Sequence, residues 1–282
     1  MTRIDSSNSA QIYQLKQVTG RMEELTVRLS TGKRIFSPND HPGDWREIST
    51  SRDRLSALTT VNDAMSGLAV SLREVSHTID AVARYLVDLQ SEYEAIVTCG
   101  KPPGTAVLME EQTLHVTKFN EILRQIDFLA NENPAELPRM LLGDDSQPGN
   151  GDVRVIVDES GGTMTIQRQG LYSGVGGLDL FSISFPPDEA QLAAISDRLV
   201  AAKNTLETRR QSFDWDTAAL SRAIQENASK AARFVQHVDN LQSVDHQETA
   251  VALQTLQVAQ SLMVNSDRLV YDLKSSLLEL LG

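Results

Sequence analysis

The sequence has few of the residues that support redox chemistry, metal binding or a flat β-sheet core. Cys99 is its one cysteine, so no disulfide can form within the chain and no multi-cysteine metal site exists. Aromatic residues make up 5% of the chain against 40% hydrophobic residues, which favours an aliphatic, helical core. The net charge of −12 argues against nucleic acid or an anionic membrane as the main partner. No run approaches 18 uncharged apolar residues, so we expect no membrane insertion.

Helix-breaking residues are missing from two long stretches. Residues 188–281 contain neither proline nor glycine, and residues 43–101 contain no proline. In the latter stretch apolar residues recur at alternating spacings of three and four, which is typical of a coiled-coil seam. The segment from Leu58 to Ile96 would form a helix about 58 Å long. The seam residues are Leu58, Val61, Met65, Leu68, Leu72, Val75, Ile79, Val82, Leu86, Leu89, Tyr93 and Ile96.

The order of these patterns predicts a mainly α protein. We expect an elongated antiparallel bundle of long helices, or a coiled coil, formed by both ends of the chain, with a small β-hairpin region in the middle. Val153 to Val157 and Met164 to Ile166 alternate around a glycine turn, which predicts the hairpin, and residues 178–185 predict a further strand. The predicted long helices span about 44–99, 105–130 and 188–240, with the hairpin insert at about 139–185.

Proline clusters and sequence breaks divide the chain into two predicted domains. Residues 1–42 with 243–282 would form a discontinuous core domain of terminal helices, and residues 43–242 a rod domain. The turn-rich segment 37–43, which contains two prolines, is the predicted joint between them. Asp44 is the predicted N-cap of the long helix that follows, with Glu47 completing a capping box.

Both terminal helices carry an apolar stripe. Two short amphipathic helices bury little surface alone, and isolated helices of this length are marginal in water. We therefore expect these stripes to find cover on neighbouring subunits. The predicted assembly interface consists of Leu15, Val18, Met22, Leu25, Leu29, Leu253, Leu256, Met263, Leu269, Leu273, Leu277 and Leu280.

The sequence contains no residue pattern that predicts a catalytic, cofactor or metal site. Residues 30–33 resemble part of a phosphate loop, but Val27 stands where the upstream glycine is required. The acidic turns 143–145 and 149–152 lack the calcium-loop pattern, and residues 174–177 lack the strand and helix of a dinucleotide site. The histidines show no metal-binding spacing on one helix face; they are His41, His77, His115, His237 and His246. We expect an interaction protein and not an enzyme.

Three short segments carry a family resemblance. Residues 28–35, 37–40 and 43–48 resemble the N-terminal segment of bacterial flagellins, with the tryptophan of the α-proteobacterial branch. Residues 248–281 resemble the C-terminal flagellin helix. The residues of this motif and joint are Arg28, Gly32, Arg34, Ile35, Pro38, Asn39, Asp40 and Trp45.

The resemblance implies a structural subunit of the bacterial flagellar filament. Such proteins are exported unfolded by the flagellar type III apparatus and polymerise outside the cell, which implies a secreted protein without a cleaved signal peptide. The implied partners are other copies of the chain, an export chaperone on the C-terminal helix, and the hook-associated and capping proteins. No cofactor is implied.

Two alternatives remain open at this point. Residues 11–15 and 275–280 also resemble the hook–filament junction protein of the same apparatus. A soluble coiled-coil interaction protein would show the same periodicity without forming a homopolymer.

Overall fold

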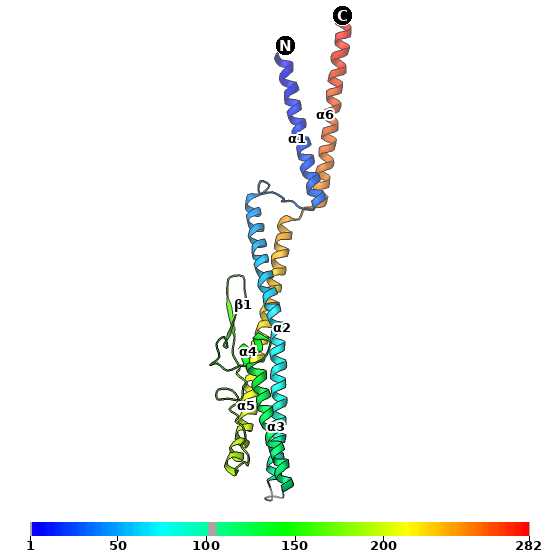
Figure 1. Cartoon of the computed structure of the whole chain (residues 1–282). Coiled ribbons are helices and arrows are strands. Elements are labelled where there is room, and N and C mark those ends of the chain that lie inside the picture. The colour runs from blue at the N-terminus through cyan, green and yellow to red at the C-terminus, as the bar shows by residue number, and fades with distance from the viewer. Residues whose placement is uncertain (1, 101–105, 282) are drawn as a thin grey trace. The chain divides into compact units, whose positions relative to one another are not determined.

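A computed structural model describes residues 2–100 and 106–281 of the chain, apart from the side chains of residues 2–11, 106, 107, 267, 274 and 277–281. Within this part the structure is mainly helical and contains one antiparallel sheet of two strands. This confirms the predicted fold class at that level. The elements, all but β2 labelled in Figure 1, are α1 (Thr2–Thr31), α2 (Pro42–Cys99), α3 (Ala106–Asn131), α4 (Glu136–Leu142), β1 (Val153–Ile156), β2 (Thr163–Ile166), α5 (Glu189–Gln242) and α6 (His246–Leu281).

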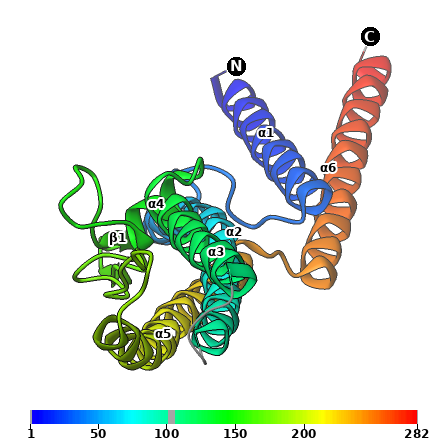
Figure 2. The same ribbon diagram turned by 60° about the horizontal axis from the view of Figure 1, so that its bottom comes forward.

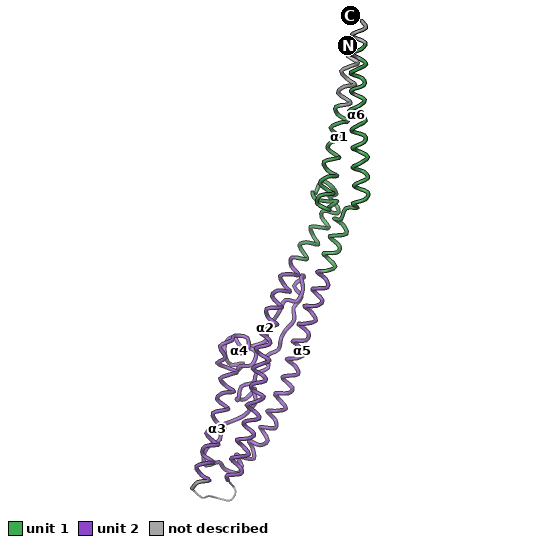
Figure 3. Tube along the Cα trace, turned by 90° about the vertical axis from the view of Figure 1, so that its right-hand side faces the viewer, with its two compact units in different colours: residues 1–55, 232–282 green, residues 56–231 purple. Residues whose placement is uncertain are grey.

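The chain divides into two compact units. Unit 1 contains residues 1–55 and 232–282, and unit 2 contains residues 56–231 (Figure 3). The start of α2 and the end of α5 therefore belong with the terminal helices, whereas the sequence prediction assigned them to the rod domain. The predicted boundary between residues 242 and 243 falls at the end of α5.

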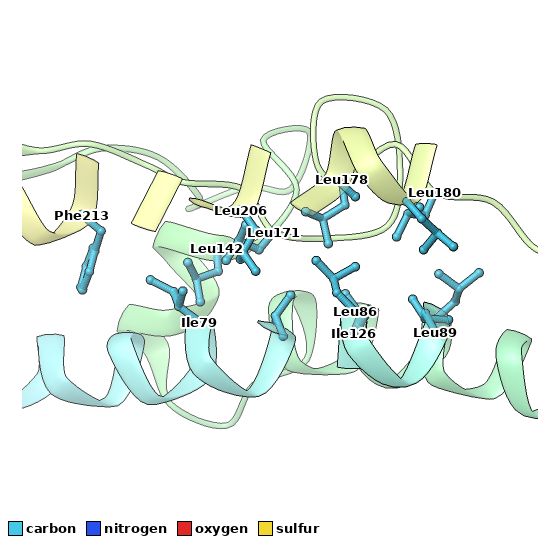
Figure 4. Packing of buried hydrophobic residues seen from close by; sticks show 14 of the residues in the cluster. Ile79, Leu86, Leu89, Ile126, Leu142, Leu171, Leu178, Leu180, Leu206 and Phe213 are labelled. Atoms are coloured by element: carbon cyan, nitrogen blue, oxygen red, sulfur yellow. The ribbon is translucent and has the colours of Figure 1, made fainter. Parts of the chain in front are cut away.

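The core of unit 2 is mainly aliphatic and is formed by α2, α3, α4 and α5 together with residues of the segment 166–183. The seam predicted along α2 is buried there, with Leu72, Ile79 and Leu86 each no more than 2% exposed. Phe119 of α3 and Phe213 of α5 join the same cluster. Figure 4 shows the α2 and α5 side chains pointing toward one another. Because these side chains are closed off from water, their burial supplies the main stabilisation of unit 2.

The predicted β-hairpin is present. Val153 pairs with Ile166 and Ile156 with Thr163 in an antiparallel register. A carboxylate oxygen of Asp158 accepts hydrogen bonds from the amides of Ser160 and Gly162, both at 2.8 Å, and this closes the turn. These bonds stabilise the charged form and hold the pKa of Asp158 below its usual value.

The strand predicted at residues 178–185 is wrong. The segment is irregular, although Leu178, Leu180 and Ile183 are buried and the residues between them are more exposed. The side chain of Asn120 on α3 donates to the carbonyl of Ile183 at 2.9 Å and accepts from its amide at 2.8 Å. An amide side chain thus takes the place of a neighbouring strand, which sequence alternation alone does not reveal.

Two helix starts also differ from the prediction. α4 was not predicted from the sequence. Pro138 lies within it and is tolerated because it occupies the first turn, where the amide needs no helical partner. α2 begins at Pro42, two residues before the predicted N-cap Asp44, and the amide of Trp45 donates to the carbonyl of His41 at 2.9 Å. Asp44 therefore lies inside the first turn and is not the N-cap.

Candidate functional site

The joint of unit 1 is closed by backbone pairing between two distant segments. Lys33 and Ser243 form an isolated antiparallel bridge. The amide of Arg34 donates to the carbonyl of Gln242 at 2.6 Å, and the amide of Val244 donates to the carbonyl of Gly32 at 3.1 Å. Gly32 has a φ of 66°, the left-handed conformation in which glycine commonly ends a helix, so it lets α1 stop and turn into this bridge.

The guanidinium of Arg34 ties the bridge to both long helices. It donates to a carboxylate oxygen of Asp44 at 2.8 Å and to the carbonyl of Leu241 at 3.0 Å. The imidazole of His41 lies 3.1 Å from the other oxygen of Asp44. The hydrogen bond from Arg34 lowers the pKa of Asp44 below its usual value. Arg34, a motif residue, thus joins the segment after α1 to α2 and α5.

A buried amide completes the joint. Gln242 is 6% exposed; its side chain donates to the carbonyl of Ile35 at 3.3 Å and accepts from the guanidinium of Arg52 at 2.8 Å. The neighbouring apolar cluster consists of Ile35, Ile48 and Val238, with Trp45 packed against it. Two further motif residues, Ile35 and Trp45, therefore have a packing role.

The other motif residues have local roles. Asp40 accepts hydrogen bonds from the amides of Phe36 and Ser37 at 3.0 and 2.8 Å, which lowers its pKa and closes the turn. Pro38 and Asn39 are exposed on that turn. Arg28 pairs with Glu24 one turn earlier on α1.

The terminal helices pack against each other beyond the joint. Figures 1 and 2 show α1 and α6 extending from the joint as a pair, with the N and C termini at the same end. A side-chain amide of Gln260 donates to the hydroxyl of Thr19 across this contact at 3.4 Å. Eight of the predicted interface residues are half-buried in unit 1, namely Leu15, Val18, Met22, Leu25, Leu29, Leu253, Leu256 and Met263.

The four remaining residues of the predicted interface lie toward the C-terminal end of α6. Leu269 and Leu273 are 64% and 61% exposed, whereas Leu277 and Leu280 lie outside the residues whose side chains are described. Leu269 and Leu273 belong to a second apolar row on α6, which the sequence reasoning did not separate from the first. We call this row the outward stripe; it consists of Val251, Val258, Leu262, Leu269 and Leu273, which are 59–64% exposed.

The outward stripe is a straight row. Its residues follow each other at spacings of seven, four, seven and four, an 11-residue repeat that matches the helix period closely. At about 100° per residue they fall within an arc of roughly 60°. Val251, Val258 and Leu262 were missed because the sequence offers two interleaved apolar patterns on α6, and the predicted interface combined members of both. The spacing itself was readable from the sequence.

The described residues offer little for other functions. Among them, no three His, Cys, Asp or Glu side chains come close enough together to hold a metal ion. His115 pairs with Glu92 between α3 and α2, and His237 pairs with Glu47 in unit 1. No helix in this part of the chain has the length and apolarity needed to cross a membrane.

No known family model and no curated protein matches this chain.

Proposed function

We propose that the protein is a structural subunit of the bacterial flagellar filament, which polymerises through its terminal helices. The observation that carries the proposal is the outward stripe of α6. Five large aliphatic side chains in one row remain 59–64% exposed although α6 already packs against α1 on another face. Exposed apolar rows of this kind are typical of surfaces that other protein chains cover.

The driving force for assembly is burial of this stripe. Covering apolar surface contributes about 25 cal/mol per Å² removed from water. Because the stripe lies on a helix that is held at the joint, association orders little additional backbone there, which lowers the entropic cost of binding.

The finer architecture forms part of the proposal. We take α2, α3 and α5 as an elongated antiparallel bundle that acts as the rod of the subunit, supported by the cluster of fully buried side chains that these helices share. The resemblance of residues 28–48 and 248–281 to flagellins supports export through the flagellar apparatus, secretion, and a chaperone that covers α6 before export. It also supports contacts with hook-associated and capping proteins.

The test replaces two stripe residues with aspartate. The double variant Leu269→Asp and Leu273→Asp should raise the critical concentration for filament formation at least about 100-fold, because burying unpaired carboxylates costs several kcal/mol and each 1.4 kcal/mol is a factor of ten. Sedimentation and electron microscopy measure it. The matched control, Gln257→Asp with Ser275→Asp, adds the same charge at exposed positions of α6 outside the stripe and should assemble normally.

Three outcomes would contradict the proposal. Filaments of normal length from the stripe variant would show that the stripe is not the assembly surface. Wild-type protein that stays monomeric after desalting, yet is secreted only by a strain with a functional flagellar export system, would favour the junction protein. Protein that is secreted neither by a strain with a functional flagellar export system nor by one that lacks it would favour a soluble coiled-coil interaction protein.

A further inference from the structure

The outward stripe lies on a face of α6 that α1 leaves open. Figure 2 shows α1 on one side of α6 only. At about 100° per residue, the centre of the stripe lies roughly 130° around α6 from the centre of its half-buried row. In a four-helix bundle each helix packs against two neighbours, so the stripe is placed to receive a second one. The half-buried row between residues 252 and 263 consists of Ala252, Leu253, Leu256, Ala259, Gln260 and Met263.

The middle of α6 carries no charge. Residues 249–266 contain no Asp, Glu, Lys or Arg, although charged residues make up 23% of the chain. A helix that covers this segment must itself be free of charge there, because burying an unpaired charge is costly. α1 does not meet this condition, since Lys16, Arg21 and Glu23 are exposed on it. A second copy of α6 meets it along the whole segment.

The spacing of the stripe is self-complementary in an antiparallel pair. Counted from Leu262, the stripe residues lie at positions −11, −4, 0, +7 and +11, and a reversed copy places them at −11, −7, 0, +4 and +11. Leu262 then faces its own counterpart, and Val251 faces Leu273. Val258 falls between Leu269 and Leu262 of the second copy. The side chains of the two rows therefore interleave, as knobs into holes.

Charges and helix dipoles favour the antiparallel direction. In a parallel pair each residue is level with its own counterpart, so Glu248 and Asp272, near the two ends of the stripe, would each meet a like charge. In the antiparallel pair about Leu262, Glu248 is level with Ser276 and Asp272 with Ala252, which are both uncharged. Opposed helices also place the positive end of one macrodipole beside the negative end of the other.

The contact reaches the size of a small specific interface. The five stripe residues are 59–64% exposed and offer on the order of 500 Å² per copy, so a symmetric pair covers roughly 1,000 Å² in total, the lower limit for a specific interface. Leu262 lies near the middle of α6, so the two helices overlap along most of their length. With α1 of each copy on the neighbouring face, the two helix pairs form a four-helix bundle.

We propose that the outward stripes of two copies pair antiparallel about Leu262 and hold the unassembled protein as a closed dimer. The contact is isologous, so it uses the stripe of both copies and stops at two. The inference goes beyond the proposed function, because the dimer forms without a filament. Filament growth repeats a heterologous contact, so dimer and filament compete for the same stripe. The dimer thus withholds the assembly surface until the two copies separate.

Disulfide cross-linking of full-length chains that carry Cys99→Ser tests both the pairing and its direction. Leu262→Cys should link to the same residue of a second copy, because the two meet at the symmetry axis. Val251→Cys and Leu273→Cys should each fail to link to themselves, since like positions lie about 33 Å apart, but should link to each other when the two variants are mixed. Gln257→Cys, exposed on another face of α6, is the control and should give no link.

Analytical ultracentrifugation measures the dimer directly, in desalted protein before filaments nucleate. Leu262→Asp places two carboxylates face to face at the symmetry axis and should raise the Kd of the dimer at least about 100-fold. The matched control Gln257→Asp adds the same charge at an exposed position outside the stripe and should leave the Kd unchanged. Circular dichroism establishes that each variant is folded.

The outcomes separate the dimer from the filament. Folded wild-type protein that sediments as a monomer at about 100 μM would overturn the dimer. Links of residue 251 to itself and of residue 273 to itself would overturn the antiparallel pairing. Filaments that grow from wholly monomeric protein would overturn the dimer and leave the filament function standing. A dimer with the expected links that never yields filaments would confirm the pairing and count against the proposed function.

Discussion

The helix pair of unit 1 and the helices of unit 2 carry the same kind of apolar repeat but bury it to different degrees. In unit 2 the α2 seam is covered by α3 and α5, and nine of its twelve side chains are buried. In the part of α1 and α6 whose side chains are described, Thr249 is the one residue classed as buried. Two helices cover each other on one face only, whereas a third helix closes the seam. The number of neighbouring helices, and not the repeat itself, therefore sets the degree of burial.

The largest expected effect comes from matched truncations in the two units. Leu86→Ala, in the closed core of unit 2, should lower the free energy of unfolding by about 3–5 kcal/mol because it leaves a cavity. Leu25→Ala, in the half-open contact of α1 with α6, should cost about 1 kcal/mol, since the site is already partly exposed. Urea denaturation of each variant measures both. Equal losses would show that the two units are packed alike.

The next largest effect concerns the joint of unit 1, and it measures how much the buried amide of Gln242 stabilises that unit. Gln242→Ala leaves the carbonyl of Ile35 and the guanidinium of Arg52 without this partner. It should lower the free energy of unfolding of unit 1 by about 1–3 kcal/mol. In a Trp215→Phe background the fluorescence of Trp45, packed on the joint cluster, reports unit 1 specifically. The control Gln236→Ala, at an exposed position of α5, should leave the transition unchanged. An unshifted Trp45 transition in the Gln242 variant would show that the amide does not hold the joint.

The smallest effect is the response of the joint to acid. The pKa of Asp44 is lowered in the folded protein, mainly by the hydrogen bond from Arg34, so its contribution to stability is present above the unfolded pKa and is lost as the pH falls through the folded pKa. Below about pH 4 the Trp45 transition should move to lower urea concentration. Asp44→Asn should reduce this difference between pH 7 and pH 2.5. An identical shift in both proteins would assign it to other carboxylates.

Much of the fold follows from local pattern. The alternating spacing from Leu58 to Ile96 predicted one long helix and its buried face, because a helix repeats every 3.6 residues regardless of its surroundings. The hairpin at residues 153–166 was readable for a similar reason, since alternation and a glycine turn are local signals. The mistaken strand at residues 178–185 shows the limit: the amide and carbonyl of Ile183 are paired by Asn120, 63 residues away, and the amides of Leu178 and Leu180 bond to the carbonyls of Tyr172 and Ser173.

The candidate site was only partly predictable. The sequence identified the terminal helices and several joint residues, yet gave no sign of the role of Gln242, because a glutamine near a helix end has no periodic signature. Its bonds to Ile35 and Arg52 join segments about 200 residues apart and depend on tertiary placement. The two interleaved rows of α6 were both present in the sequence, but only the position of α1 shows which row is covered.

The bridge between residues 32–34 and 242–244 also governs when the protein can fold. The bond from Arg34 to Leu241 spans 207 positions, so the ribosome must synthesise most of the chain before α1 can meet its partner. Until then α1 is a nascent segment of marginal helicity, exposed to proteases and chaperones. Closing so large a loop is a late step with an entropic barrier, and the terminal pair should therefore form after the helices of unit 2.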